Sequence, residues 1–143
     1  MRKPYIPILA FALLLLLCMP LPLEMATSVI PGWHTTVFAP QVIPTIIISL
    51  ILLIVLFTYW RLSRKASRIS ILVFAAHFLL TLPLVFYSKL FVFLLPIGID
   101  ASDTTVLAER LRLLSYAGLI ADLLFIAGQV LFATYAYKIL KKS

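Results

Sequence analysis

Two ionisable side chains lie deep inside long apolar stretches of the chain. Asp122 lies within 113–137, and His77 lies within 69–95. Ionisable groups are costly in hydrocarbon, so each is expected to face other helices of a membrane bundle. One interpretation is a proton or cation path, or a polar pocket. The other is a hydrogen-bonded clasp between helices, which we favour because one acid and one histidine make a short relay.

Other polar residues recur at helical spacing beside these two. In 69–95 they fall at intervals of seven, four and seven, which places them along one side of a helix in a left-handed packing. With about 1.5 Å of rise per residue and a membrane core of about 30 Å, Asp122 is expected level with Thr81, and Gln129 within about one turn of His77. We therefore predict contacts of Thr81 with Asp122 and of His77 with Gln129. The predicted intramembrane polar seam comprises Ser70, His77, Thr81, Ser88, Ser115, Asp122 and Gln129.

The second histidine, His34, lies in the run Pro31-Gly-Trp-His-Thr-Thr-Val-Phe-Ala-Pro40. This run resembles a segment of membrane subunits of the polysulfide-reductase type, including those of alternative complex III. The resemblance implies a quinol-side position for His34, beside Trp33. This chain has Ala39 in place of a proline, and it lacks the glycine-rich helix that follows in that family. The other interpretation is an interfacial loop, with Trp33 as a headgroup anchor and His34 contacting a partner.

Several kinds of chemistry lack the residues that they need. Cys18 is the one cysteine, so the chain forms no internal disulfide, and thiol-oxidising four-helix enzymes are excluded. His34 and His77 are expected toward opposite faces of the membrane, which argues against a haem shared by the two. No cluster has metal-ligand spacing, and neither a nucleophile elbow nor a phosphate-binding glycine loop occurs. We predict no metal, no cofactor and no catalytic residue, and therefore not an enzyme acting alone.

The elements that position these residues are predicted membrane spans. Of the 143 residues, 64% are hydrophobic and 12% are charged, whereas soluble domains carry about 25% charged residues. The net charge of +7 comes from basic residues at the ends of apolar runs. There they orient a membrane protein instead of forming a continuous face for phosphates. We therefore predict contact with the lipid bilayer and no nucleic-acid partner.

Four apolar stretches predict an all-α, integral membrane four-helix bundle of two transmembrane hairpins, in a single domain, 1–143. Pro20 and Pro22 are expected to end the first helix early, and Pro83 to kink the third. Tyr59 and Trp60 are expected to mark the inner end of the second. A short amphipathic stretch, 104–112, leads into the fourth. The expected spans are 5–23, 44–60, 69–95 and 113–137, with outer loops 24–43 and 96–112 and an inner loop 61–68.

The first span allows two interpretations. A basic start and a short apolar middle suit a cleaved secretory signal with a site after Ala26. However, Glu24 stands three residues before that cut, where a small residue is preferred. We therefore favour an uncleaved anchor helix.

Basic residues predict the orientation of the spans. Cytoplasmic loops of membrane proteins carry an excess of Lys and Arg, and this topology places nine of the twelve on one side with no acid. Both termini are therefore expected to be cytoplasmic, in a multi-pass protein of a bacterial inner membrane. The nine residues are Arg2, Lys3, Arg61, Arg64, Lys65, Arg68, Lys138, Lys141 and Lys142.

Few ionisable residues and small loops favour a small, non-catalytic accessory or structural subunit of a larger inner-membrane complex, for which a respiratory complex is one candidate. Other membrane subunits would then be its partners. One alternative is a homo-oligomeric small transporter or channel element that uses Asp122 and His77. Another is a quinol-contacting subunit that uses His34.

Overall fold

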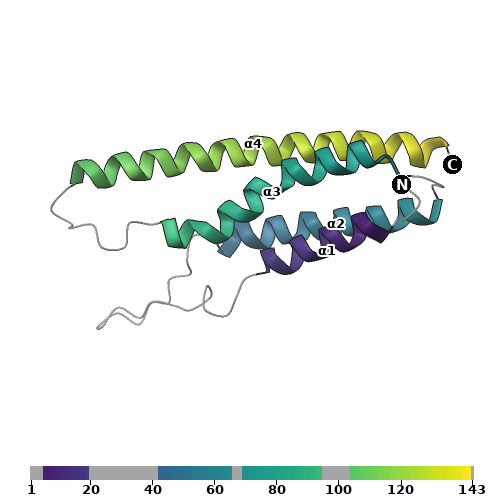
Figure 1. The fold of residues 1–143 in the computed structure, drawn as a ribbon, viewed down its shortest axis with the longest axis horizontal. Coiled ribbons are helices and arrows are strands. Elements are labelled where there is room, and N and C mark those ends of the chain that lie inside the picture. Colours follow the sequence, from purple (N-terminus) through teal and green to yellow (C-terminus); the bar gives the residue numbers. More distant parts are fainter. Residues whose placement is uncertain (1–4, 20–41, 66–68, 95–103, 143) are drawn as a thin grey trace.

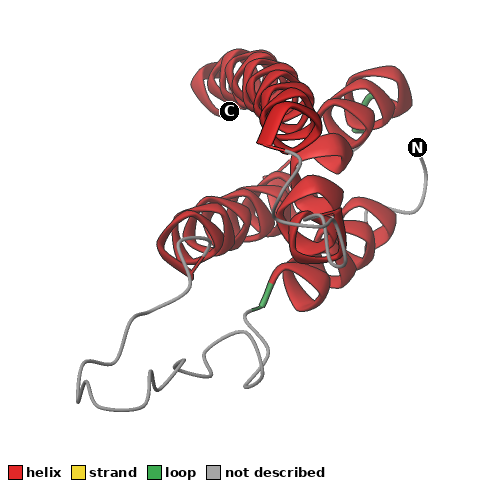
Figure 2. Cartoon of the chain, turned by 90° about the vertical axis from the view of Figure 1, so that its left-hand side faces the viewer, coloured by secondary structure: helices red, strands yellow, loops and turns green. Residues whose placement is uncertain are grey.

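The structure is a computed structural model that describes residues 5–19, 42–65, 69–94 and 104–142. Within these ranges the chain forms four α-helices and no strand, which confirms the all-α prediction. The helices are α1 (Tyr5–Cys18), α2 (Val42–Lys65), α3 (Ile71–Leu94) and α4 (Thr104–Lys142) (Figure 1). In a view turned by 90° the helices are seen close to end-on (Figure 2).

Three of the helices are long and apolar enough to cross a membrane. The qualifying segments are Ile43–Lys65, Ile71–Lys89 and Ala108–Lys141. Helix α1 is apolar but has only 14 residues, about 21 Å at the usual rise, which is less than a core of about 30 Å. It ends at Cys18, before Pro20 and Pro22, as these prolines predict.

Helix α4 has 39 residues and begins at Thr104, inside the expected outer loop 96–112. The amphipathic lead-in 104–112 is therefore continuous with the span. Its charged residues Glu109, Arg110 and Arg112 are exposed, and all three are good helix formers. These charged residues lie outside the apolar segment, but the helix continues through them to Thr104.

The helices run alternately up and down. The start of α1, the end of α2, the start of α3 and the end of α4 lie at one end of the bundle (Figure 1). Helix α3 packs most extensively against α4, and α1 against α2; α1 also touches α3, and α2 touches α4. Pro83 lies inside α3, and Figure 1 shows that this helix changes direction near its middle, as expected of a proline that removes a backbone donor.

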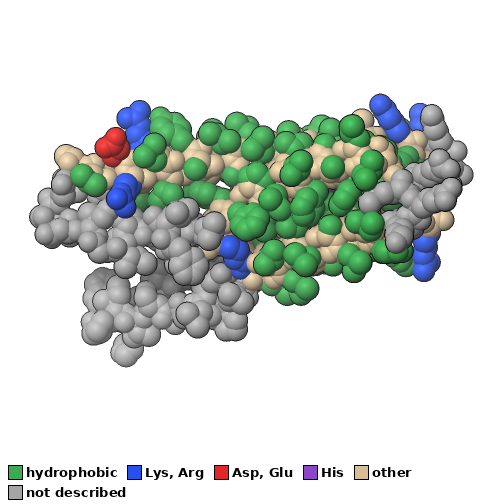
Figure 3. All heavy atoms as spheres, viewed as in Figure 1, with side chains coloured by type: hydrophobic (Ala, Val, Ile, Leu, Met, Phe, Trp, Pro, Cys, Tyr) green, Lys and Arg blue, Asp and Glu red, His purple; other side chains and the backbone are tan. Residues whose placement is uncertain are grey.

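Helices α2 and α4 each bury one narrow stripe at spacings of three and four residues. Such spacing keeps side chains on one side of a helix in a left-handed packing. In α2 the stripe is Thr45, Ile48, Leu52, Val55, Tyr59 and Leu62, and in α4 it is Gly118, Ala121, Phe125, Gly128 and Phe132. The remaining surface is mostly apolar, and Figure 3 shows hydrophobic side chains over the middle of one face, with most of the Lys and Arg side chains toward the ends.

Two glycines of α4 allow α3 to approach closely. A Cβ atom on Gly118 would lie 2.8 Å from Cζ and from the hydroxyl oxygen of Tyr87, and one on Gly128 would lie 3.0 Å from Cβ of Leu80. The Tyr87 hydroxyl donates to the carbonyl of Leu114 at 3.0 Å. Small residues at helix contacts in lipid serve this purpose.

Short polar contacts also join the helix ends. The ammonium group of Lys89, near the end of α3, donates to the carbonyl of Met19 at 2.7 Å. Met19 follows the last residue of α1, where a cation also complements the helix dipole. The Ser49 hydroxyl of α2 donates to the carbonyl of Thr45 at 2.8 Å, and its oxygen lies 3.5 Å from the carbonyl oxygen of Cys18. Lys89 thus contacts the end of α1 as well as lying near the end of its own helix.

Candidate functional site

His77 lies at the centre of the bundle, fully buried between two aromatic rings. Its ring centroid is 4.6 Å from that of Phe11 in α1 and 4.5 Å from that of Phe132 in α4, with interplanar angles of 29° and 9°. The imidazole is therefore sandwiched by side chains from two other helices. The contacts exclude water from both faces of the ring.

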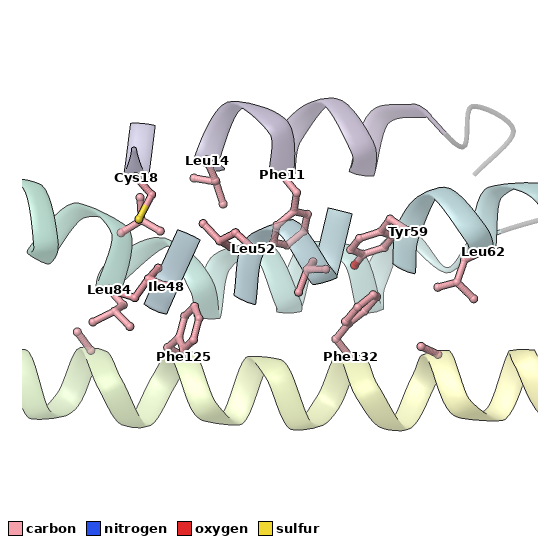
Figure 4. Packing of buried hydrophobic residues seen from close by; sticks show 14 of the residues in the cluster. Phe11, Leu14, Cys18, Ile48, Leu52, Tyr59, Leu62, Leu84, Phe125 and Phe132 are labelled. Carbon is pink, nitrogen blue, oxygen red and sulfur yellow. The ribbon is translucent and has the colours of Figure 1, made fainter. Parts of the chain in front are cut away.

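Tyr59 of α2 completes this cluster. Its ring stacks on Phe132 at 4.4 Å and on Phe11 at 5.2 Å, and its hydroxyl oxygen lies 3.2 Å from Nδ1 of His77. Figure 4 shows Phe11, Tyr59 and Phe132 converging from α1, α2 and α4. All four helices therefore meet at His77.

The other ring nitrogen of His77 faces the side-chain amide of Gln129, which in turn contacts the Thr81 hydroxyl. Nε2 of His77 lies 3.4 Å from Oε1 of Gln129 in α4. Nε2 of Gln129 donates to the Thr81 hydroxyl at 3.4 Å. The Thr81 hydroxyl donates in turn to the backbone carbonyl of His77 at 2.7 Å. We call Tyr59, His77, Gln129 and Thr81 the central polar chain.

The donors and acceptors of this chain fix the histidine tautomer. The single hydroxyl proton of Thr81 goes to a carbonyl, so Thr81 accepts from the amide nitrogen of Gln129. The amide oxygen of Gln129 therefore faces Nε2 of His77, and an oxygen of this kind only accepts. Nε2 must then carry a proton, which leaves Nδ1 of a neutral imidazole to accept from the Tyr59 hydroxyl. The assignment follows from the network as a whole.

The central polar chain starts at Tyr59 of α2 and closes on His77 of α3, because its last acceptor is the backbone carbonyl of His77 itself. Within the described residues, every buried side-chain nitrogen or oxygen has a hydrogen-bond partner. In the same residues, no three His, Cys, Asp or Glu side chains gather where they could hold a metal ion. The arrangement is suited to holding four helices in one register.

Three members of the predicted polar seam are brought together, and the predicted contact of His77 with Gln129 is present. The predicted contact of Thr81 with Asp122 is wrong. Asp122 is exposed on α4, while Thr81 is buried and bonds to His77 and Gln129. The buried stripe of α4 passes through Ala121, and the next residue projects about 100° further around a helix. The prediction failed on the direction in which the Asp122 side chain projects from α4.

The three serines of the seam lie apart from the central polar chain. Ser70 and Ser115 are exposed, and Ser88 is half-buried. The hydroxyls of Ser88 and Ser115 donate to carbonyls of their own helices, Val85 at 2.8 Å and Leu111 at 2.9 Å. The backbone N–H of Ser70 donates to the Tyr135 hydroxyl at 2.8 Å, an additional link between the start of α3 and α4. His34 and Trp33 lie outside the described residues.

The sequence reasoning missed Tyr59, Phe11 and Phe132. Tyr59 was expected to mark the inner end of the second span, but it is fully buried. Its neighbour Trp60 is 40% exposed, with the Arg64 guanidinium 4.2 Å from its ring, as expected of an interfacial anchor. A signal for Tyr59 was available: it stands fourteen residues, or two heptads, after Thr45 in a stretch otherwise rich in Ile and Leu.

Comparisons with protein-family models, with curated proteins and with solved structures found no match to this chain. The case for any function therefore depends on the sequence and the geometry of this chain.

Proposed function

We propose that this chain is a small, non-catalytic accessory or structural subunit of a larger complex in a bacterial inner membrane. The observation that carries the proposal is the closed central polar chain. The polar side chains at the core of the bundle are bonded to one another and stacked against aromatic rings. They have the character of a clasp between helices, which in lipid needs hydrogen bonds and close packing.

We further propose that all four helices cross the membrane as two hairpins, with both termini cytoplasmic. The distribution of Lys and Arg supports this orientation. On α4, Arg112 lies 5.7 Å from the ring of Tyr116, and Lys141 lies 5.8 Å from the ring of Tyr137. The two tyrosines stand 21 residues apart, about 32 Å along a helix axis, which matches a core of about 30 Å. Helix α1 would be a short span beside them.

A homo-oligomeric transporter or channel element is the first alternative. It is favoured by the presence of Asp122 and His77 within apolar segments. It requires a path lined by both, yet His77 is fully buried while Asp122 is exposed. Purified protein in vesicles would carry a proton or cation flux that depends on pH and is lost in Asp122→Asn. The accessory role predicts no such flux.

A quinol-contacting subunit is the second alternative, and it depends on the resemblance of residues 31–40 to polysulfide-reductase-type subunits. His34→Ala would then lower quinol turnover of the host complex. If turnover is unchanged, this alternative fails and the accessory role stands.

The accessory role is tested by the native mass of the tagged, full-length chain, extracted gently from its own membrane. We expect migration within a much larger heteromeric assembly of constant composition through two purification steps. Migration as a monomer or a small homo-oligomer would reject the proposal.

A further inference from the structure

Asp122 is a carboxyl group on the outside of the bundle, within a membrane-spanning segment. It is exposed and lies inside Ala108–Lys141. It stands six residues from Tyr116, about 9 Å toward the centre of the membrane. Ionised or protonated, a carboxyl in hydrocarbon loses the hydrogen bonds that water would supply. A position of this kind therefore calls for a polar partner.

Among the described residues no basic side chain forms an ion pair with Asp122, although its charge acts on nearby Tyr87. The Lys and Arg side chains described on α2 and α4 lie toward the helix ends. Lys89 donates to the carbonyl of Met19. Tyr87 of α3 packs over Gly118, which lies one helical turn before Asp122 on α4. Its hydroxyl donates to the carbonyl of Leu114.

Asp122 also lies on a second stripe of α4, beside the one that faces the bundle. This outer stripe consists of the exposed residues Ser115, Leu119, Asp122, Ile126 and Ala133. Their spacings of four, three, four and seven are those of a helix that packs on another helix in a left-handed crossing. The stripe has small or polar residues at three of its five positions, as helix contacts in lipid do.

A second copy of this chain is a poor match for the outer stripe. A two-fold axis through the stripe would bring Asp122 opposite Asp122, and like charges in low dielectric repel. The complementary group is a cation or strong donor at the same depth. Arg and Lys are the side chains that pair with an intramembrane acid.

We propose that the outer stripe docks against a transmembrane helix of a different subunit, which places a Lys or Arg side chain opposite Asp122. This inference rests on the proposed accessory function and names the chemistry of the partner. It also explains why Asp122, the acid deepest within the span, lies outside the closed interior.

Photocrosslinking tests the contact with a matched pair of positions. Leu119 lies on the outer stripe and Ile120 does not, although the two are adjacent and are 58% and 56% exposed. A photoreactive phenylalanine replaces each in turn in the full-length chain, in its own membrane. We expect a protein adduct from position 119 and little or none from position 120. The adduct peptide from position 119 is expected to come from another protein's apolar span that contains Lys or Arg.

Four crosslinking results would overturn the proposal. They are an adduct with this chain's own peptide, equal adducts from both positions, a partner span without a basic residue, and no protein adduct from position 119. The last result would mean that the outer stripe faces lipid and that Asp122 interacts with lipid headgroups instead of a protein side chain.

Substitution of Asp122 tests the charge. Removing one member of a desolvated ion pair leaves the other unpaired, so Asp122→Leu is expected to lower the share of the chain in the assembly by about tenfold or more. Asp122→Asn keeps hydrogen bonding and is expected to lose less. Ile120→Ala, on the other face at the same depth, is the control and is expected to have no effect. Because Asp122 is exposed, its variants should unfold in detergent like the wild type.

The two proposals fail in different ways. If the wild-type chain does not migrate in a large heteromeric assembly, the accessory function fails and this inference fails with it. If the wild type does so and Asp122→Leu remains in the assembly as fully as Ile120→Ala, only the docking surface is wrong.

Discussion

Thr81 and Thr134 make the same local hydrogen bond in different surroundings. The hydroxyl of each donates to the carbonyl four residues earlier, at 2.7 Å to His77 and 2.8 Å to Val130. Thr81 is fully buried and also accepts from Gln129, whereas Thr134 is exposed. Comparing substitutions at these two positions therefore separates the contribution of the central polar chain to the free energy of unfolding from the contribution of a threonine that bonds only within its own helix.

We predict that Thr81→Val lowers the free energy of unfolding by about 1 kcal/mol, because it leaves the Gln129 amide without its acceptor. Thr134→Val is expected to change the same quantity by less than about 0.5 kcal/mol. The measurement is unfolding in detergent micelles titrated with a denaturing detergent. Equal effects from the two substitutions would mean that the central polar chain does not stabilise the fold.

The level of individual residues is also where prediction from sequence was weakest. Spacing and depth were enough to pair His77 with Gln129, because both lie near the middle of an adjacent antiparallel pair. They were not enough for Asp122, since α4 is apolar around most of its circumference. The rotation of such a helix is decided by which small residues allow close contact, here Gly118 and Gly128.

At the scale of elements, the contact of α3 with α4 depends on the space above Gly118. Gly118→Ala would place a Cβ 2.8 Å from the Tyr87 ring, so the ring must move and its bond to the Leu114 carbonyl is lost. We predict a loss of about 1–2 kcal/mol in unfolding free energy, despite the better helix propensity of alanine.

A double-mutant cycle isolates this contact. In a Tyr87→Leu background the obstructing hydroxyl and ring are gone, so Gly118→Ala is expected to be neutral or stabilising. Micelle unfolding of the four proteins gives the coupling. An unchanged cost of Gly118→Ala in that background would contradict a direct clash with Tyr87.

Much of the element-level fold follows from the sequence. Long apolar runs and prolines predicted four helices, the early end of α1 and the bend in α3. Helix α4 begins at Thr104, before the apolar segment begins, because helix formation and hydrophobicity are separate properties. The buried face of α2 was not predicted, because Ile and Leu surround the helix and only the heptad from Thr45 to Tyr59 distinguishes one side.

At the scale of the whole molecule, the proposed topology predicts which residues reach each side of the membrane. Lys65 and Arg110 are both exposed, near opposite ends of the bundle. Single cysteines, Lys65→Cys and Arg110→Cys, would be placed in a Cys18→Ala background, since Cys18 is buried. Arg61, Arg64 and Arg68 remain to hold the orientation in the first variant.

In spheroplasts with an intact inner membrane, a membrane-impermeant thiol reagent is expected to label Arg110→Cys. It is expected to label Lys65→Cys only after the inner membrane is permeabilised. The background protein without cysteine controls for other reactions. Labelling of Lys65→Cys in intact spheroplasts would invert the proposed orientation, and the depth assigned to Asp122 would then be counted from the other face.

The central claim is that the central polar chain stabilises the fold of this chain, whereas the outer stripe of α4 binds it to a larger assembly. Its most direct test is the native mass of the full-length chain from its own membrane, for the wild type, Tyr59→Phe and Asp122→Leu side by side. Tyr59→Phe removes the hydroxyl that bonds His77 but keeps the aromatic stack. We expect the wild type and Tyr59→Phe in the same large heteromeric assembly, and Asp122→Leu released as a folded small species. A wild-type chain that migrates alone, or an assembly that retains Asp122→Leu and loses Tyr59→Phe, would contradict the claim.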